Sequence, residues 1–203
     1  MENVIIVSKT QMRNGYCVGG IIEDTGQLIR IHGARGQNLG LDAPYEIGDV
    51  WLMDVERAWN VRPAPHTEDM QTIAFDKISN IGFSGIINYV RNHVHELNVA
   101  RGPIQNAFDG ALHFDGNKNY VNRNHVPNYS TQFWIPDQPL YRVESYGKFY
   151  YRYNNVRIKF VGLQETVAVI PAGSIVRISL ANWWDGDGSG EDRCYLQLSG
   201  WYL

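Results

Sequence analysis

The residues whose types could carry chemistry gather in two short stretches of the 203-residue sequence. The first, KFYYRYNNVRIKF at 148–160, mixes aromatic and basic side chains around Asn154 and Asn155. Because Asn tolerates the left-handed backbone of a type I′ turn, this pair predicts a two-residue hairpin. Counting outward from the turn places one set of rings on a side that faces the core: Phe149, Tyr151, Tyr153 and Phe160.

The other side of the predicted hairpin is basic and carries one ring. It presents Lys148, Tyr150, Arg152, Arg157 and Lys159, which we call the basic face. Such a face can hold single-stranded nucleic acid, because cations follow the phosphates and rings stack on bases. The alternative is an ordinary solvated face. Arg152 opposite Arg157 costs roughly a few tenths to 1 kcal/mol, so this pair needs either carboxylates, such as those at 185–192, or an anionic ligand.

The second stretch holds His66, Glu68 and Asp69 within four residues. A histidine beside carboxylates could serve as a general base or a metal ligand, and hence as part of a hydrolase. No second histidine stands at ligand spacing, and the pattern favours a turn closed by local hydrogen bonds from Thr67 and Asp69. The sequence therefore predicts no catalytic residue, no metal site and no cofactor.

A further basic loop, IRIHGARGQNLG at 29–40, contains a G-x-x-G segment around Arg35. A glycine-rich loop lets the backbone approach a phosphate closely, although a plain loop has the same pattern. Arg30 and Arg35 are therefore predicted as a second group of nucleic-acid contacts.

Short alternating segments separated by turn residues predict a mostly β protein. The predicted strands are 4–10, 16–23, 27–32, 49–59 and 71–75 in the first half, and 141–153, 156–162, 165–170, 174–184 and 193–203 in the second. Helical spacing over 84–97, with Ser84 as the N-cap, predicts one helix. Residues 101–139 read as a long loop carrying short strands. The expected fold is two OB-like small β-barrels, 1–78 and 140–203, joined by a helix and loop at 79–139.

Composition limits the classes of function. A net charge of −3 argues against a basic protein that binds DNA over most of its surface. A content of 19% charged and 44% hydrophobic residues is typical of a folded domain. Two cysteines are too few for a disulfide scaffold or a cysteine-based zinc site. The sequence has neither a signal-peptide pattern nor an apolar run long enough to span a membrane, so a cytoplasmic location without a membrane partner is expected.

Several short motifs resemble the bacterial dual OB-fold domain family. They are GYCVGGIIEDTGQLIRIHG, in which the turn at Gly26 is followed by aliphatic residues and Arg30, then the strand start Gly48-Asp49, PHTEDM and VRIKF. The last two are Ser179-Leu180 and Cys194-Tyr195, which lie in the closing strands. The resemblance implies two OB-like barrels that bind nucleic acid or nucleotides, no assigned catalytic chemistry, and genome neighbourhoods of bacterial defence systems.

Three hypotheses about function follow. The first is a non-enzymatic module that binds single-stranded nucleic acid or a nucleotide through the basic face. The second is a protein–protein interaction adaptor that uses exposed aromatic residues as a hot spot, namely Trp183, Trp184 and Trp201. The third is a hydrolase at His66, Glu68 and Asp69.

Overall fold

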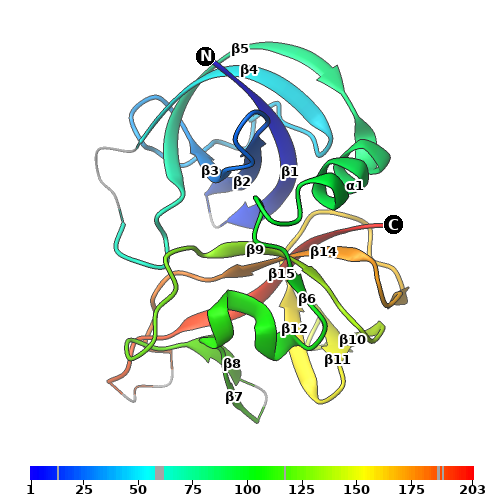
Figure 1. Cartoon of the computed structure of the whole chain (residues 1–203). Helices are drawn as coiled ribbons and strands as arrows, with labels where there is room; N and C mark the ends of the chain where they lie inside the picture. The colour runs from blue at the N-terminus through cyan, green and yellow to red at the C-terminus, as the bar shows by residue number, and fades with distance from the viewer. Residues whose placement is uncertain (13, 58–61, 117, 187, 189) are drawn as a thin grey trace. The chain divides into compact units, whose positions relative to one another are not determined.

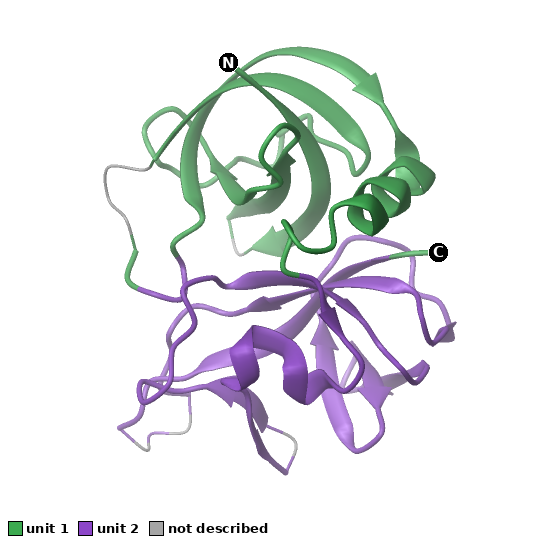
Figure 2. Ribbon diagram, viewed as in Figure 1, with its two compact units in different colours: residues 1–63, 67–98, 202–203 green, residues 64–66, 99–201 purple. Residues whose placement is uncertain are grey.

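The computed structural model describes residues 1–12, 14–57, 62–116, 118–186, 188 and 190–203. It is mostly β, as predicted, and Figure 1 labels its elements. The chain divides into two compact units (Figure 2), one made of residues 1–63, 67–98 and 202–203, the other of 64–66 and 99–201. The predicted helix lies in the first unit, and 99–139 lies in the second. The domain limits drawn at 78 and 139 stay a prediction.

The first unit is a closed five-stranded barrel, as expected of an OB fold. Its strands are β1 (Glu2–Met12), β2 (Gly15–Ile22), β3 (Leu28–His32), β4 (Asp49–Arg57) and β5 (Asp69–Asn80). They follow the order β1-β2-β3-β5-β4, and only β3 and β5 run parallel among the pairs that form the barrel. Aliphatic side chains fill the interior, including Val4, Ile6, Val18, Ile29, Ile31 and Met53. β5 is longer than the predicted strand 71–75.

The helix α1 (Gly82–Asn92) belongs to the first unit, and it begins earlier than predicted. The prediction of Ser84 as the N-cap is wrong. Ile81 takes that position, and the side chain of Asn80 accepts a hydrogen bond from the Gly82 N–H at 2.9 Å. Gly82 has a φ of +60°, which glycine adopts without steric cost, so the turn before the helix is set at this residue. Within the described residues, no helix is long and apolar enough to cross a membrane.

The second unit is built on one large sheet. Its main path is β13-β10-β11-β12-β15-β14-β9-β6, and β8 joins β15 and pairs in turn with β7. The bounds are β6 (Ala100–Arg101), β7 (His113–Asp115), β8 (Lys118–Val121), β9 (Thr131–Ile135), β10 (Leu140–Ser145), β11 (Lys148–Tyr153), β12 (Val156–Phe160), β13 (Val169–Ile170), β14 (Ile175–Leu180) and β15 (Cys194–Tyr202), with a 3₁₀ segment at Ile104–Gly110.

The single strand predicted at 141–153 is wrong, because it is two strands, β10 and β11. Tyr146 and Gly147 separate them, and both have positive φ. The tyrosine hid this turn, since an aromatic residue is typical of strands and uncommon at positive φ.

Aromatic side chains form much of the core of the second unit. Tyr151 and Phe160 each pack against Trp201, with ring centroids 5.1 and 4.8 Å from the indole. Trp201 is only 3% exposed. The prediction that Trp201 is an exposed interface residue is therefore wrong.

Candidate nucleic-acid interface

The predicted hairpin is present as β11 and β12, with the predicted register. The cross-strand pairs are Tyr153 with Val156, Arg152 with Arg157, Tyr151 with Ile158 and Tyr150 with Lys159. Asn154 takes the left-handed conformation, with a φ of 49°, as its place in the turn requires. Tyr151, Tyr153 and Ile158 are buried in the core. The alternation therefore leaves the basic face on the outer side of the sheet.

The cations of the basic face are available to a ligand. Lys148, Arg152 and Lys159 are exposed, whereas Tyr150 and Arg157 are half-buried. No ion pair involves any of these four cations within the part of the chain that the structure describes. Unpaired cations on one face create a positive potential that attracts an anionic partner.

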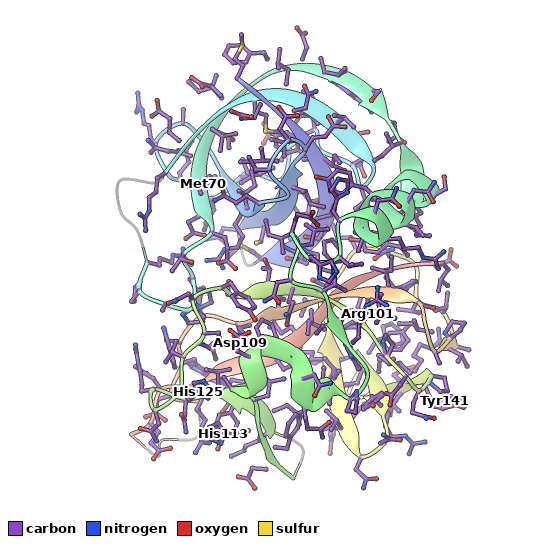
Figure 3. All side chains as sticks on the ribbon, in the orientation of Figure 1. Met70, Arg101, Asp109, His113, His125 and Tyr141 are labelled. Carbon is purple, nitrogen blue, oxygen red and sulfur yellow. The ribbon has the colours of Figure 1, made fainter. Side chains whose placement is uncertain are left out.

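Neighbouring strands extend the basic face into two rows. Tyr141 of β10, labelled in Figure 3, pairs with Arg152, so Tyr141, Arg152 and Arg157 form one row across three strands. Tyr150 pairs with Lys159, and Lys159 pairs with Gln197 on the parallel strand β15. The second row therefore places an aromatic ring, an ammonium group and a carboxamide side by side.

Arg157 has local interactions that offset its repulsion from Arg152. Its guanidinium lies 4.5 Å from the centroid of the Tyr150 ring. A cation–π contact of this kind contributes about 0.5–1 kcal/mol, which is close to the cost of two like charges paired across a sheet. Within the described residues, the basic face therefore forms without a neutralising carboxylate.

Carboxylates at 185–192 are one of the two ways in which the sequence could neutralise the basic face, and three of them make other contacts in the structure. Asp192 pairs with Arg123 at 2.9 Å, and Glu191 pairs with Arg193 at 3.4 Å. Asp185 accepts a hydrogen bond from the Gly190 N–H at 3.0 Å. Asp187 lies outside the described residues. Glu191 and Asp192 therefore pair with arginines outside the basic face.

A pocket of about 350 Å³ opens beside the basic face, and all of its lining residues belong to the second unit. The side chains that define its chemistry are Asn119, Tyr150, Arg157, Lys159, Trp184 and Tyr195. Sequence reasoning found three of these as members of the basic face and Trp184 as an interface aromatic. It missed Asn119 and Tyr195, because β8 and β15 are brought to β12 only by long-range pairing.

Asn119 connects β8 to the hairpin. Its Nδ2 donates to the carbonyl oxygen of Arg157 at 2.9 Å, and the residue is 5% exposed. Tyr195 pairs with Tyr120 across β15 and β8, and the guanidinium of Arg193 lies 4.5 Å from the Tyr120 ring centroid. Tyr195 lines the pocket, and Tyr120 and Arg193 pack behind it without being among the lining residues.

The three tryptophans proposed for an adaptor do not share one environment. Trp184 is 62% exposed and makes an edge contact with Tyr195, with centroids 6.0 Å apart. Trp183 is half-buried, and its indole N–H donates to the Ala64 carbonyl at 2.9 Å. The guanidinium carbon of Arg123 lies 3.8 Å from the centroid of the Trp183 ring. With Trp201 in the core, only Trp184 remains as an exposed anchor, and it lines the pocket.

Asp69 is the centre of a buried ion-pair cluster in the first unit. The Nε of Arg30 lies 2.6 Å from Asp69 Oδ1, the Nε2 of His32 lies 3.1 Å from it, and the Nε of Arg62 lies 3.4 Å from Oδ2. Burial alone raises the pKa of Asp69, but the His32 hydrogen bond and the nearby Arg30 and Arg62 charges outweigh it and hold the pKa below its usual value. This carboxylate is therefore ionised and paired.

The structure divides His66, Glu68 and Asp69 between the two units. His66 belongs to the second unit, where its Nε2 lies 3.7 Å from the buried Cys194 Sγ, whereas Asp69 belongs to the first. The carbonyl of Glu68 accepts the Arg30 N–H at 2.8 Å, which is a strand contact. No cluster of three or more potential metal ligands is found within the described residues.

Arg30 and Arg35, the predicted second group of nucleic-acid contacts, have different environments in the first unit. Arg35 is exposed in a turn, where its N–H donates to Gln37 Oε1 at 2.9 Å. Arg30 is 8% exposed and paired with Asp69. Arg30 is thus placed to support the barrel, and Arg35 is the member of this group that faces solvent.

A family model described as the dual OB-containing domain matches residues 2–201. No curated protein and no solved structure matches this chain.

Proposed function

This chain belongs to the dual OB-containing domain family, and on that premise we propose that it is a non-enzymatic module that binds single-stranded nucleic acid or a nucleotide. OB folds commonly bind oligonucleotides on a sheet face and its adjoining loops. The observation that carries the proposal is the basic face, whose exposed cations have no ion-pair partner within the described residues. Its role in a bacterial defence system stays a prediction.

The aromatic residues support a single-stranded ligand in particular. Tyr150, Trp184 and Tyr195 border the same pocket as Arg157 and Lys159. Unpaired bases can stack on such rings, whereas the bases of a duplex are already stacked on one another. We place Arg35 in the first unit as a secondary contact with the backbone of the ligand.

Binding to a labelled single-stranded oligonucleotide, followed by fluorescence anisotropy, tests the proposal. If all four cations of the basic face engage phosphates, the logarithm of the association constant should fall with the logarithm of salt concentration with a slope of about −2.8. Affinity should then drop about 50-fold between 50 and 200 mM salt. No binding at 50 mM salt, to either DNA or RNA, would contradict the proposal.

Arg152→Glu is the single substitution that isolates the basic face. Arg152 is exposed and makes no ion pair within the described residues, so its replacement leaves the fold intact. We expect about tenfold weaker binding and a salt slope shallower by about 0.7, because one phosphate contact is lost and a repulsive charge is added. The matched control is Arg91→Glu on the exposed side of α1, which makes the same change in net charge. Equal losses in both variants would remove the hairpin from the binding site.

A further inference from the structure

The pocket beside the basic face has the chemistry of a site for one nucleobase. This inference rests on the proposed function and deepens it, because it concerns how bases are held and not only how phosphates are attracted. A volume of about 350 Å³ lies at the lower end of the range for ligand pockets. Such a space suits one nucleotide and is too small for several bases.

Asn119 supplies the first observation that points to a ligand. The side chain is more than nine-tenths buried and lines the pocket. Because its Nδ2 donates to the Arg157 carbonyl, the orientation of the amide is determined, and Oδ1 is left as an acceptor. No donor reaches this Oδ1 within the described residues. Buried polar atoms are rarely left without a partner, so this acceptor is suited to an N–H group of a ligand.

Arg157 supplies a second atom of the same kind. Its Nε is buried and has no acceptor within the described residues, although its guanidinium packs on the Tyr150 ring. One acceptor on β8 and one donor on β12, two strands that both pair with β15, therefore remain unused beside the same pocket. The hydrogen-bonding edge of a nucleobase offers a complementary pair, an N–H group next to a ring nitrogen or carbonyl oxygen.

The rings of the pocket supply a surface for stacking. Trp184 is 62% exposed, its ring makes an edge contact with Tyr195, and Gly186 packs closely against its six-membered ring. Base–aromatic stacking tolerates any base, because each base has a π-face. Lys159 lines the same pocket, and no acidic residue lines it within the part of the chain that the structure describes. A phosphate attached to the bound base would therefore meet a cation.

We propose that this pocket binds one unpaired nucleobase with its phosphate. The base stacks on Trp184, its N–H donates to Asn119 Oδ1, and its phosphate lies against Lys159. Bases elsewhere along the strand remain outside the pocket, while their phosphates follow the basic face.

An abasic scan of a labelled single-stranded oligonucleotide tests this site. Each position in turn is replaced by an abasic residue, and binding to the full chain is measured by anisotropy. We expect one position whose base contributes about tenfold in affinity, while the other positions contribute twofold or less. In Trp184→Ala, affinity for the intact strand should fall about tenfold, and the abasic penalty at that position should disappear. Trp184→Phe should keep most of the affinity, because it keeps a ring.

The matched control is Tyr146→Ala, which removes a fully exposed ring from the β10–β11 turn, away from the residues that line the pocket. Its affinity and its abasic profile should match those of the unmodified protein. Competition by nucleoside monophosphates distinguishes the two sources of the base. If millimolar nucleoside monophosphate displaces the labelled oligonucleotide, the pocket binds a free nucleotide; if it does not, the pocket binds a base within a strand.

Salt-sensitive binding with a flat abasic profile would overturn the base pocket and leave the proposed function standing. A tenfold loss in Tyr146→Ala equal to that in Trp184→Ala would also overturn it. The absence of any binding at low salt would overturn both proposals.

Discussion

Asp69→Asn is expected to destabilise the first unit by about 3–5 kcal/mol, the usual effect of breaking a buried ion pair by removing one partner. Asp69 is 4% exposed and Arg30 is 8% exposed, so the substitution leaves a guanidinium charge buried without its carboxylate. Arg62 and His32 lose the same partner. Urea unfolding at pH 7, followed by tryptophan fluorescence and circular dichroism, measures the difference in unfolding free energy.

The matched control is Asp76→Asn on the same strand, β5. Asp76 is exposed and takes part in no ion pair within the described residues, so the change should stay within about 0.5 kcal/mol. If both variants lost the same free energy of unfolding, the effect would come from the net charge and not from the buried cluster.

The pH dependence of the Asp69 variant follows from the lowered pKa of Asp69. A carboxyl whose pKa is lower in the folded state stabilises the fold above its unfolded pKa, about 3.9, and this contribution is lost as pH falls through the folded pKa. The free-energy difference between the unmodified protein and Asp69→Asn should thus be largest at neutral pH and shrink below about pH 4. A difference that stays constant down to pH 2 would contradict an ionised, paired Asp69.

Reversing three charges of the basic face is expected to abolish most nucleic-acid binding. The triple variant combines Lys148→Glu, Arg152→Glu and Lys159→Glu, all at exposed positions without ion pairs within the described residues. Three attractive contacts become repulsive, so affinity for a single strand at 50 mM salt should fall on the order of 100-fold or more. Any remaining binding should have a salt slope near −0.7, because Arg157 is the one cation of this face that is left.

Reversing three positive charges outside the basic face separates the effect of the basic face from the effect of net charge. Arg57, Arg91 and Arg101 are exposed, and changing each to Glu alters the net charge by the same amount. If the basic face holds the strand, this control should keep its affinity within about threefold, because none of the three arginines belongs to the basic face and salt weakens longer-range repulsion. Similar losses in both triple variants would mean that net charge governs binding and that the hairpin is not the site. Circular dichroism on both proteins checks that each remains folded.

The hairpin and its basic face could be derived from thirteen residues of sequence. Asn154 and Asn155 determine the turn, and the alternation of rings and cations on either side then assigns each side chain to a face. These are local rules: turn conformation and the two-residue period depend on neighbours along the chain. The same rules located most strands of the barrel, and the family motifs indicated its type.

Other features depended on contacts between distant segments. Trp201 is buried because the last residues of β15 are buried on both faces of the strand. A strand with one exposed face would alternate between buried and exposed residues, and this segment does not. His66 and Asp69 are three positions apart, yet they belong to different units. Their closeness in sequence gave no sign of this division, which depends on contacts with distant segments.

The pocket shows the same division. The sequence alone determined that Tyr150, Arg157 and Lys159 lie on one outer face, because alternation in a hairpin requires it. Only the tertiary structure decided that Asn119, Trp184 and Tyr195 meet them, since this depends on β15 lying parallel to β12 and on β8 joining β15. Strand order is chosen among many long-range pairings by the apolar surface that each one buries, and no short stretch of sequence contains that information.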